Sequence, residues 1–179
     1  MKRIHKVKTA VIVKDTIPDE KIEILRDNCN NLRDRAMIDF LLSTGIRVGE
    51  LVRLNIDERE CVVYGKGDKE MKAYFDAKTK IHLLNYIESR TDNNIALFVS
   101  LNKQHSRLTE SGVELRLREM GKKLGVEKVH PHKFRRTMAT RAIEKGMPIE
   151  QVQKILGHEQ IDTTLRYAMV NQNNVKLSH

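Results

Sequence analysis

Residues 131–157 read PHKFRRTMATRAIEKGMPIEQVQKILG, and this stretch decides the fold class. Proline is favoured in the first turn of a helix, and glycine just past its end. The pattern therefore predicts one helix over residues 131–144 and another over residues 148–156, each beginning at a proline. Gly146 and Gly157 supply the two stops. The last third of the chain is expected to be helix after helix.

Apolar residues recur at helical spacing in the rest of the chain as well. On the predicted helix over residues 32–43 they are Leu32, Ala36, Met37, Phe40 and Leu41, with Gly45 as the stop. Pro18 marks a further helix start, and Thr109 is a candidate cap for a helix that Gly125 ends. Other helices are predicted over residues 47–54, 81–90 and 162–171.

One segment is typical of strands instead. Residues 61–64 and 71–75 flank the glycine-rich turn Gly65-Lys-Gly-Asp-Lys69, which predicts two antiparallel strands. The predicted fold class is therefore mainly α with a small antiparallel β-sheet (α+β). Residues 1–15, whose first fourteen members include five Lys and Arg and no acid, are interpreted as a basic linker remnant. Residues 16–179 are then one globular domain.

Amino-acid composition excludes several classes of function and favours others. The 179 residues carry 33 Lys+Arg against 24 Asp+Glu, a formal net charge of +9 at pH 7, which points to a polyanionic partner. No apolar run approaches the roughly 18 residues of a membrane span, and Cys29 and Cys61 suit neither a disulfide framework nor a zinc finger. Aromatic residues at 4% argue against stacked bases and favour contacts to duplex phosphates. We expect a cytoplasmic, nucleoid-associated bacterial protein.

His132 and Arg135 form an HxxR pattern on the predicted helix over residues 131–144. Residues at i and i+3 share one helix face, so two potential phosphate ligands point the same way. An isolated HxxR is more often a solvated basic face, because such short patterns are common. His130 and His132 have no further clustered ligands, so a metal site is not expected.

Other candidates also have ordinary interpretations. Arg47 stands at a predicted helix start, where a guanidinium and backbone N–H groups can meet a phosphate, but for an isolated arginine a pair with Glu50 on the helix surface is the more common outcome. Lys66 lies in the glycine turn and can simply be solvated. His158 can be a packing histidine that follows a helix stop, and Tyr167 can be a half-buried helix tyrosine.

Taken together, these residues favour a catalytic function over the separate ordinary interpretations. Metal-free phosphoryl transfer on DNA requires cations for the charge on the phosphate oxygens, an acid for the leaving group and a nucleophile. No cofactor is needed for this chemistry. The candidate catalytic residues are Arg47, Lys66, His132, Arg135, His158 and, as the nucleophile, Tyr167.

Four segments, in order along the chain, resemble the catalytic domain of the tyrosine recombinase (phage integrase) family. They are Leu42-Ser-Thr-Gly-Ile-Arg-Val-Gly-Glu-Leu51, Gly65-Lys-Gly-Asp-Lys-Glu70, Pro131-His-Lys-Phe-Arg-Arg-Thr137 and Leu156-Gly-His-Glu-Gln-Ile-Asp-Thr-Thr-Leu-Arg-Tyr167. The resemblance runs from about Ile17 to Tyr167 and implies the fold of DNA breaking-rejoining enzymes. One departure is Arg136, where many relatives have histidine.

The resemblance implies a site-specific DNA recombinase or integrase with a cationic site. Arg47 and Arg135 would bind the non-bridging oxygens of the scissile phosphate. Lys66 would be the general acid that protonates the departing 5′ oxygen.

The resemblance also assigns the remaining three candidates. His132 would assist proton transfer at the nucleophile, and His158 would donate a hydrogen bond to the phosphate. Tyr167 would attack phosphorus and give a 3′-phosphotyrosine, from which strand exchange and religation proceed without metal or ATP.

The partners that the resemblance implies are double-stranded DNA, other recombinase subunits in a synaptic tetramer and accessory DNA-bending proteins, with no membrane partner. Relatives also carry an N-terminal core-binding domain, for which this chain has no room. Two alternatives stay open: a catalytically inactive DNA-binding regulator of the same fold, and a strand-relaxing enzyme like the type IB topoisomerases.

Overall fold

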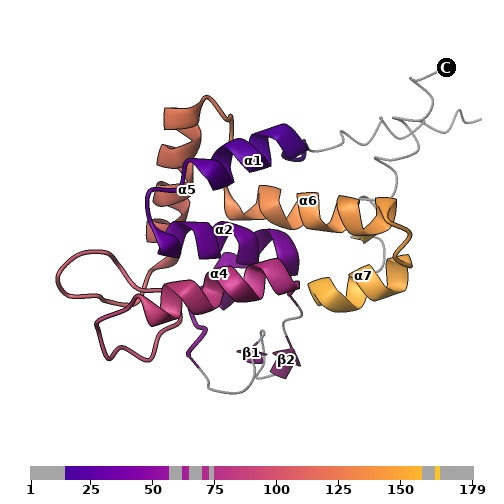
Figure 1. Cartoon of the computed structure of the whole chain (residues 1–179). Coiled ribbons are helices and arrows are strands. Elements are labelled where there is room, and N and C mark those ends of the chain that lie inside the picture. The colour runs from indigo at the N-terminus through magenta and orange to yellow at the C-terminus, as the bar shows by residue number, and fades with distance from the viewer. Residues whose placement is uncertain (1–14, 57–61, 65–69, 73–74, 159–163, 166–179) are drawn as a thin grey trace, which may run out of the picture.

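The structure is a computed structural model that describes residues 15–56, 62–64, 70–72, 75–158 and 164–165. This part of the chain is mainly helical, as the sequence predicts (Figure 1). Its helices are α1 (Asp19–Asp27), α2 (Leu32–Thr44), α3 (Val48–Leu51), α4 (Ala77–Glu88), α5 (Glu110–Leu124), α6 (Pro131–Glu144) and α7 (Ile149–Leu156). Two strands, β1 (Val62–Tyr64) and β2 (Glu70–Lys72), pair antiparallel with Val63 opposite Met71.

Caps and glycines explain where most helices begin and end. The hydroxyl of Thr109 accepts a hydrogen bond from the Gly112 N–H at the start of α5, and α6 has the predicted bounds. Gly45 ends α2 in the left-handed conformation, with φ +60°. The α4 helix begins four residues earlier than predicted, because the Asp76 carboxylate accepts from the Thr79 N–H and caps it there.

Two predicted helices remain to be compared with the structure: one is shorter than predicted, and the other lies mostly outside the described residues. The one expected over residues 47–54 is a single turn, α3, with Arg47 as its N-cap. The last one, over residues 162–171, lies outside the described residues except for Thr164 and Leu165, which are helical.

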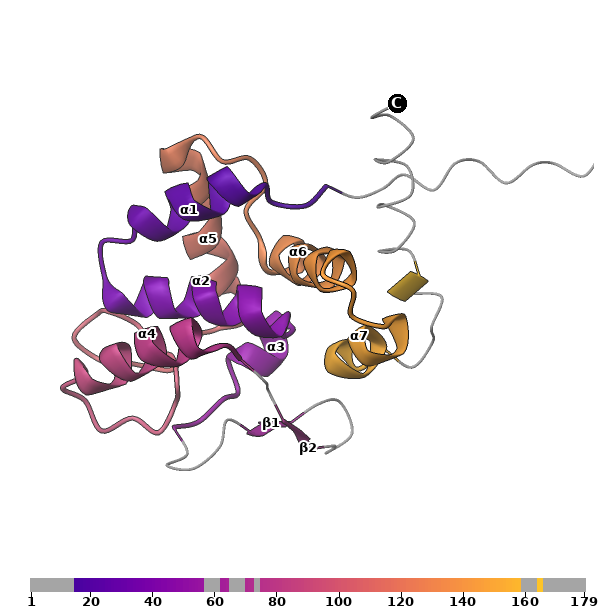
Figure 2. The same ribbon diagram turned by 45° about the vertical axis from the view of Figure 1, so that its right-hand side comes forward.

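The α2 helix lies at the centre of the fold, with α4 and α6 packed against it and α1 across it (Figures 1 and 2). Its flanks bury a core that includes the fully enclosed rings of Phe40, Phe98 and Phe134. A second, smaller cluster joins α6 to α7 through Met138, Ala139, Val152 and Leu156. This cluster fixes α7, and with it Gly157 and His158, against α6.

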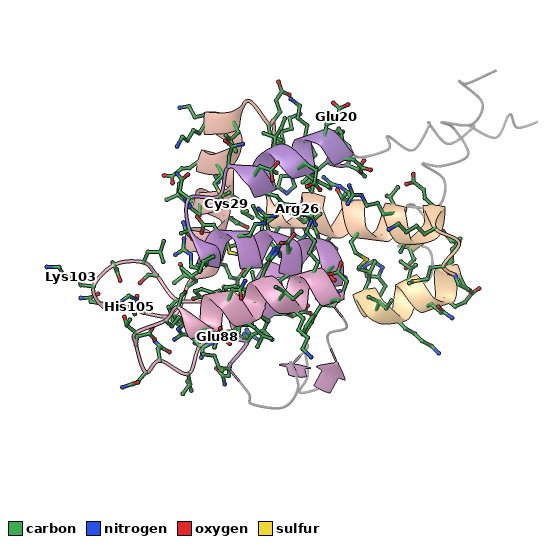
Figure 3. All side chains as sticks on the ribbon, in the orientation of Figure 1. Glu20, Arg26, Cys29, Glu88, Lys103 and His105 are labelled. Carbon is green, nitrogen blue, oxygen red and sulfur yellow. The ribbon has the colours of Figure 1, made fainter. Side chains whose placement is uncertain are left out.

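The α2 helix is buried on nearly every side, which the predicted amphipathic pattern did not anticipate. Leu32, placed on the inward face by that pattern, is 47% exposed, whereas the Asp39 side chain is fully buried. Hydrogen-bonding groups from two other helices lie against the Asp39 carboxylate. The Arg26 Nε of α1 lies 2.6 Å from its carboxylate, and the His82 Nδ1 of α4 lies 2.5 Å from it. Arg26 reaches from α1 toward α2 (Figure 3).

The segment that leads into α1 is fastened to α6. Lys133 Nζ, which is almost fully buried, lies 2.8 Å from the Asp15 carboxylate, and the Ile17 N–H donates to the Thr137 hydroxyl at 2.9 Å. The helix with the HxxR pattern is therefore held on one side by α2 and on another by residues 15–17. No helix within the described ranges is both long and apolar enough to cross a membrane.

Candidate active site

Among the candidate residues that the structure describes, Arg135 is the best enclosed, with 6% of its surface exposed. It stands in the second turn of α6 and its guanidinium reaches two main-chain carbonyls. Nη1 donates to the Gly45 oxygen at 2.7 Å, and Nη2 donates to the Leu156 oxygen. Gly45 ends α2 and Leu156 ends α7. One side chain therefore joins the ends of two helices that are far apart in sequence.

Arg47 lies two residues beyond the first of these carbonyls. Its backbone N–H donates to Glu50 Oε2 at 3.0 Å, and its guanidinium Nη1 donates to Glu50 Oε1 at 2.9 Å. Its Nη2 lies 3.4 Å from the carbonyl oxygen of Gly157, which follows α7. The side chain is 41% exposed, while that of Glu50 is 11% exposed. The expected pair with Glu50 is thus present, and it holds a guanidinium that still faces solvent.

His158 follows the left-handed Gly157 that ends α7. Both of its backbone groups are held by Gln153: the His158 N–H donates to the Gln153 carbonyl at 3.1 Å, and the Gln153 side-chain amide donates to the His158 carbonyl at 3.0 Å. Its ring Nδ1 lies 2.9 Å from the hydroxyl of Thr164. The imidazole is therefore held at its base and at one ring nitrogen.

The electrostatics show that these three residues share one site. Burial first, and then the positive charges of Arg135 and Arg47, lower the pKa of His158 from its ordinary 6.5 to about 4. His158 is consequently neutral at neutral pH. Two guanidinium groups and one neutral imidazole, from three separate parts of the sequence, converge at the ends of α2 and α7.

His132 differs from Arg135 in its exposure to solvent. It is exposed in the first turn of α6, whereas Arg135 is buried one turn later. The Arg135 guanidinium contacts the carbonyls of Gly45 and Leu156, and that His132 serves the same phosphate stays a prediction. Burial lowers the pKa of the neighbouring His130, and the charges of Arg136 and His132 lower it further.

Lys66 and Tyr167 fall outside the described residues. Lys66 stands in the sequence between β1 and β2, and Tyr167 stands two residues after the described Thr164 and Leu165. Their placement at the site stays a prediction.

Sequence reasoning missed several residues that build this site. They are Gln153, Thr164 and the backbone carbonyls of Gly45, Leu156 and Gly157. A carbonyl acceptor has no side-chain signature, so no pattern could have identified those three. Thr164 could have been noticed, because a hydroxyl at a short interval from a candidate histidine is a potential ring partner.

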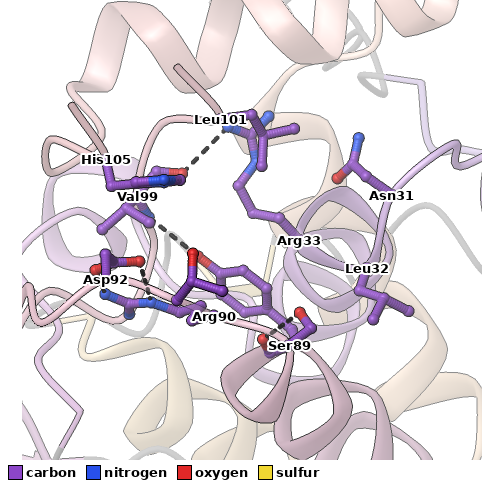
Figure 4. A pocket seen from close by; sticks show the side chains of 11 residues that line it. Asn31, Leu32, Arg33, Ser89, Arg90, Asp92, Val99, Leu101 and His105 are labelled. Carbon is purple, nitrogen blue, oxygen red and sulfur yellow. Dashed lines mark hydrogen bonds and ion pairs between the residues drawn. The ribbon is translucent and has the colours of Figure 1, made fainter. Parts of the chain in front are cut away.

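A pocket of about 150 Å³ lies elsewhere, where the start of α2 meets the end of α4 (Figure 4). Its cations are already paired: Arg90 Nε donates to Asp92 at 3.0 Å, and Arg33 Nη1 donates to the Val99 carbonyl at 3.2 Å. Across the described ranges, no group of three or more His, Cys, Asp or Glu side chains is placed to hold a metal ion.

Comparison with known proteins identifies relatives of this chain. The model of the Phage integrase family matches residues 16–174. Tyrosine recombinase XerC of Leptospira interrogans is 39% identical over 168 residues, covering 88% of this chain and 54% of that protein. XerC of Staphylococcus aureus is 34% identical and covers 88% of this chain and 57% of that protein. The chain thus spans about half the length of these curated relatives.

Solved structures of recombinases are also similar to this chain. The crystal structure of XerA recombinase matches with a TM-score of 0.78 and 32% identity, over 90% of this chain and 61% of that one. The XerH site-specific recombinase bound to its difH substrate matches with a TM-score of 0.72 and 24% identity, over 87% of this chain and 50% of that one, which shows a shared fold. With a family model that covers most of its length, the chain belongs to the Phage integrase family.

Proposed function

We propose that this chain is the catalytic domain of a site-specific tyrosine recombinase that cuts and rejoins double-stranded DNA. The observation that carries the proposal is the convergence of Arg47, Arg135 and His158 at the ends of α2 and α7. Two relatives that are 39% and 34% identical are named tyrosine recombinases, which supports the same activity here. The net charge of +9 suits a DNA partner.

In the proposed reaction the two arginines bind the scissile phosphate. As the attacking oxygen adds to phosphorus, negative charge grows on the non-bridging oxygens, and fixed guanidinium groups in a partly buried site stabilise it without reorganising. Arg47 suits this role because Glu50 orients its guanidinium while 41% of the side chain stays exposed. Arg135 adds its positive charge at the phosphate and also fixes the two segments that carry Arg47 and His158.

Bond making and breaking are assigned to the remaining residues. The Tyr167 hydroxyl oxygen forms a bond to phosphorus, and the bond from phosphorus to the 5′ oxygen breaks. Lys66, between β1 and β2, gives its proton to that 5′ oxygen, and His132 assists removal of the phenol proton. A phenol has a pKa of about 10 in water, so nearby cations must favour its anionic form as it reacts.

The product is a 3′-phosphotyrosine and a free 5′ hydroxyl. Because the phosphodiester energy is kept in the protein–DNA bond, a 5′ hydroxyl from a partner strand can reverse the reaction without ATP. We further propose that residues 16–179 form the catalytic domain and residues 1–15 a linker remnant. Assembly of four subunits on DNA, with accessory DNA-bending proteins, is part of the same proposal.

Covalent capture tests this function. The full chain is incubated in EDTA with a pool of nicked duplexes whose core sequence is randomised, so that a cleaved fragment diffuses away and the adduct accumulates. Protein-bound strands are recovered under denaturing conditions and sequenced. An adduct with an enriched sequence supports the recombinase. An enriched, bound sequence without any adduct would instead indicate a DNA-binding regulator of this fold.

A further inference from the structure

Thr164 contacts the ring of His158 from a fully buried position. Its hydroxyl oxygen lies 2.9 Å from His158 Nδ1, and none of the Thr164 surface is exposed. Because Gln153 already fixes the His158 backbone through both its N–H and its carbonyl, the remaining freedom of this residue is in the side chain. The contact at Nδ1 restrains the ring and so helps to set where the second ring nitrogen, Nε2, points.

The ring that Thr164 holds is neutral. Burial, with the charges of Arg135 and Arg47, lowers the pKa of His158 to about 4. A neutral imidazole carries one N–H and one lone pair, and the bond made by one nitrogen decides which of the two the other nitrogen presents. A threonine hydroxyl can donate or accept, so it can satisfy Nδ1 in either protonation pattern.

We propose that Thr164 is a positioning residue whose hydroxyl donates to His158 Nδ1, keeps the ring proton on Nε2 and so gives a neutral His158 a hydrogen-bond donor for the scissile phosphate. The use of that donor rests on the proposed function. The protonation pattern itself is a property of the free protein.

The direction of the bond follows from the chemistry of the proposed ligand. Phosphate oxygens accept hydrogen bonds and cannot donate to a lone pair. A ring with its proton on Nδ1 would direct the lone pair of Nε2 toward an anion, which is unfavourable. A hydroxyl that donates to Nδ1 keeps the ring proton on Nε2, from which a neutral His158 can donate to a phosphate oxygen, and this contact then stays the same across neutral pH.

Two variants separate the hydroxyl of Thr164 from its bulk. Thr164→Val keeps the branched shape and removes the hydroxyl, whereas Thr164→Ser keeps the hydroxyl and removes a methyl group. Thr140→Val is the matched control, because Thr140 is buried on α6 and its hydroxyl oxygen contacts no hydrogen-bond partner in the described part of the chain. If loss of a buried hydroxyl were harmful in general, Thr140→Val would show it.

The first readout is the nitrogen NMR spectrum of His158 in the free full chain at neutral pH. We expect a proton on Nε2 and none on Nδ1, and we expect the Nδ1 signal to move toward that of a free lone pair in Thr164→Val. In Thr164→Ser it should stay near its original position. A proton found on Nδ1 of the unmodified protein would overturn the proposal, whether or not the chain cleaves DNA.

The second readout is the rate of covalent adduct formation at saturating DNA, on the duplex recovered by the capture experiment. Thr164→Val should slow it about tenfold to a hundredfold, the usual cost of removing the partner that orients a functional imidazole. Thr164→Ser and Thr140→Val should stay within about threefold of the unmodified protein. Equal rates for Thr164→Val and Thr140→Val would overturn the proposal, whereas no adduct from the unmodified chain would overturn the proposed function and leave the NMR result standing.

Discussion

Arg135 donates a 2.7 Å hydrogen bond from Nη1 to the carbonyl oxygen of Gly45, a residue ninety positions earlier in the chain. The same guanidinium donates to Leu156. Gly45 stands two residues before Arg47, and Leu156 stands two residues before His158. A buried arginine that was expected only to contact a phosphate thus also builds the loops that carry its partners.

Substitution of Arg135 by lysine should therefore reduce stability as well as activity. An ammonium group on a single stem cannot reach both carbonyls as a planar fork does, so at least one charge-assisted hydrogen bond is lost. We expect the free energy of unfolding to fall by about 1.5–3 kcal/mol in urea denaturation. Arg141→Lys is the control, since Arg141 pairs with an Asp19 side chain that is 87% exposed and should change by less than about 1 kcal/mol. Equal losses in the two variants would contradict this role of Arg135.

Gly45→Ala should cost more than Gly125→Ala. Both glycines end helices in the left-handed conformation, with φ +60° and +64°, so each substitution carries about 1–2 kcal/mol of backbone strain. A methyl group at Gly125 meets open space, but at Gly45 it meets the end of the Met138 side chain and lies 3.2 Å from Leu156 Cδ2. We expect Gly45→Ala to lose roughly 1–3 kcal/mol more, measured by urea denaturation of both variants. A difference near zero would show that the contact between α2, α6 and α7 is loose.

Acid sensitivity should depend on His158. The pKa of this residue is about 4 in the folded chain and 6.5 ordinarily, so the unfolded state binds more protons between these values. Folding stability should then rise with pH through this window and be lost as pH falls from about 6.5 toward 4. His158→Gln cannot take up a proton, so its melting temperature should fall less steeply over the same range. Parallel curves for the two proteins would argue against a buried neutral His158.

Lys66 can be tested by changing the leaving group. Lys66→Ala should form little adduct on an ordinary duplex, because the departing 5′ oxygen needs a proton. On a duplex with a sulfur at that bridging position the departing thiolate needs no acid, so adduct formation should recover. If the sulfur substrate gives no recovery while the unmodified protein cleaves it, Lys66 is not the acid.

The helices could be predicted from the sequence because their ends carry local signals. Pro131, Thr109 and the glycines after α2 and α5 act on neighbouring residues, so the α6 bounds and the α5 cap were confirmed. The burial of α2 was missed for the opposite reason. Asp39 is stabilised by Arg26 and His82 from two other helices, and such partners are visible only once the chain is folded.

The candidate site, too, could be predicted from the sequence only in part. Its residue types could be chosen from motifs, and Arg47, Arg135 and His158 do converge. The inward course of the Arg135 side chain could not be predicted, because its acceptors are backbone carbonyls that any residue could supply. The hold of Thr164 on His158 depends on a ring orientation that the sequence does not specify.

The most direct test of the central claim is peptide mapping of the covalent adduct formed in EDTA by the full chain. The chain has four tyrosines, and we expect DNA to be attached to Tyr167 through a 3′-phosphate. Tyr167→Phe should bind the same duplex and yield no adduct, while Tyr86→Phe, which alters a hydroxyl that accepts from the Val99 N–H, should still yield it. An adduct on another residue, or one that persists in Tyr167→Phe, would show that Tyr167 is not the nucleophile.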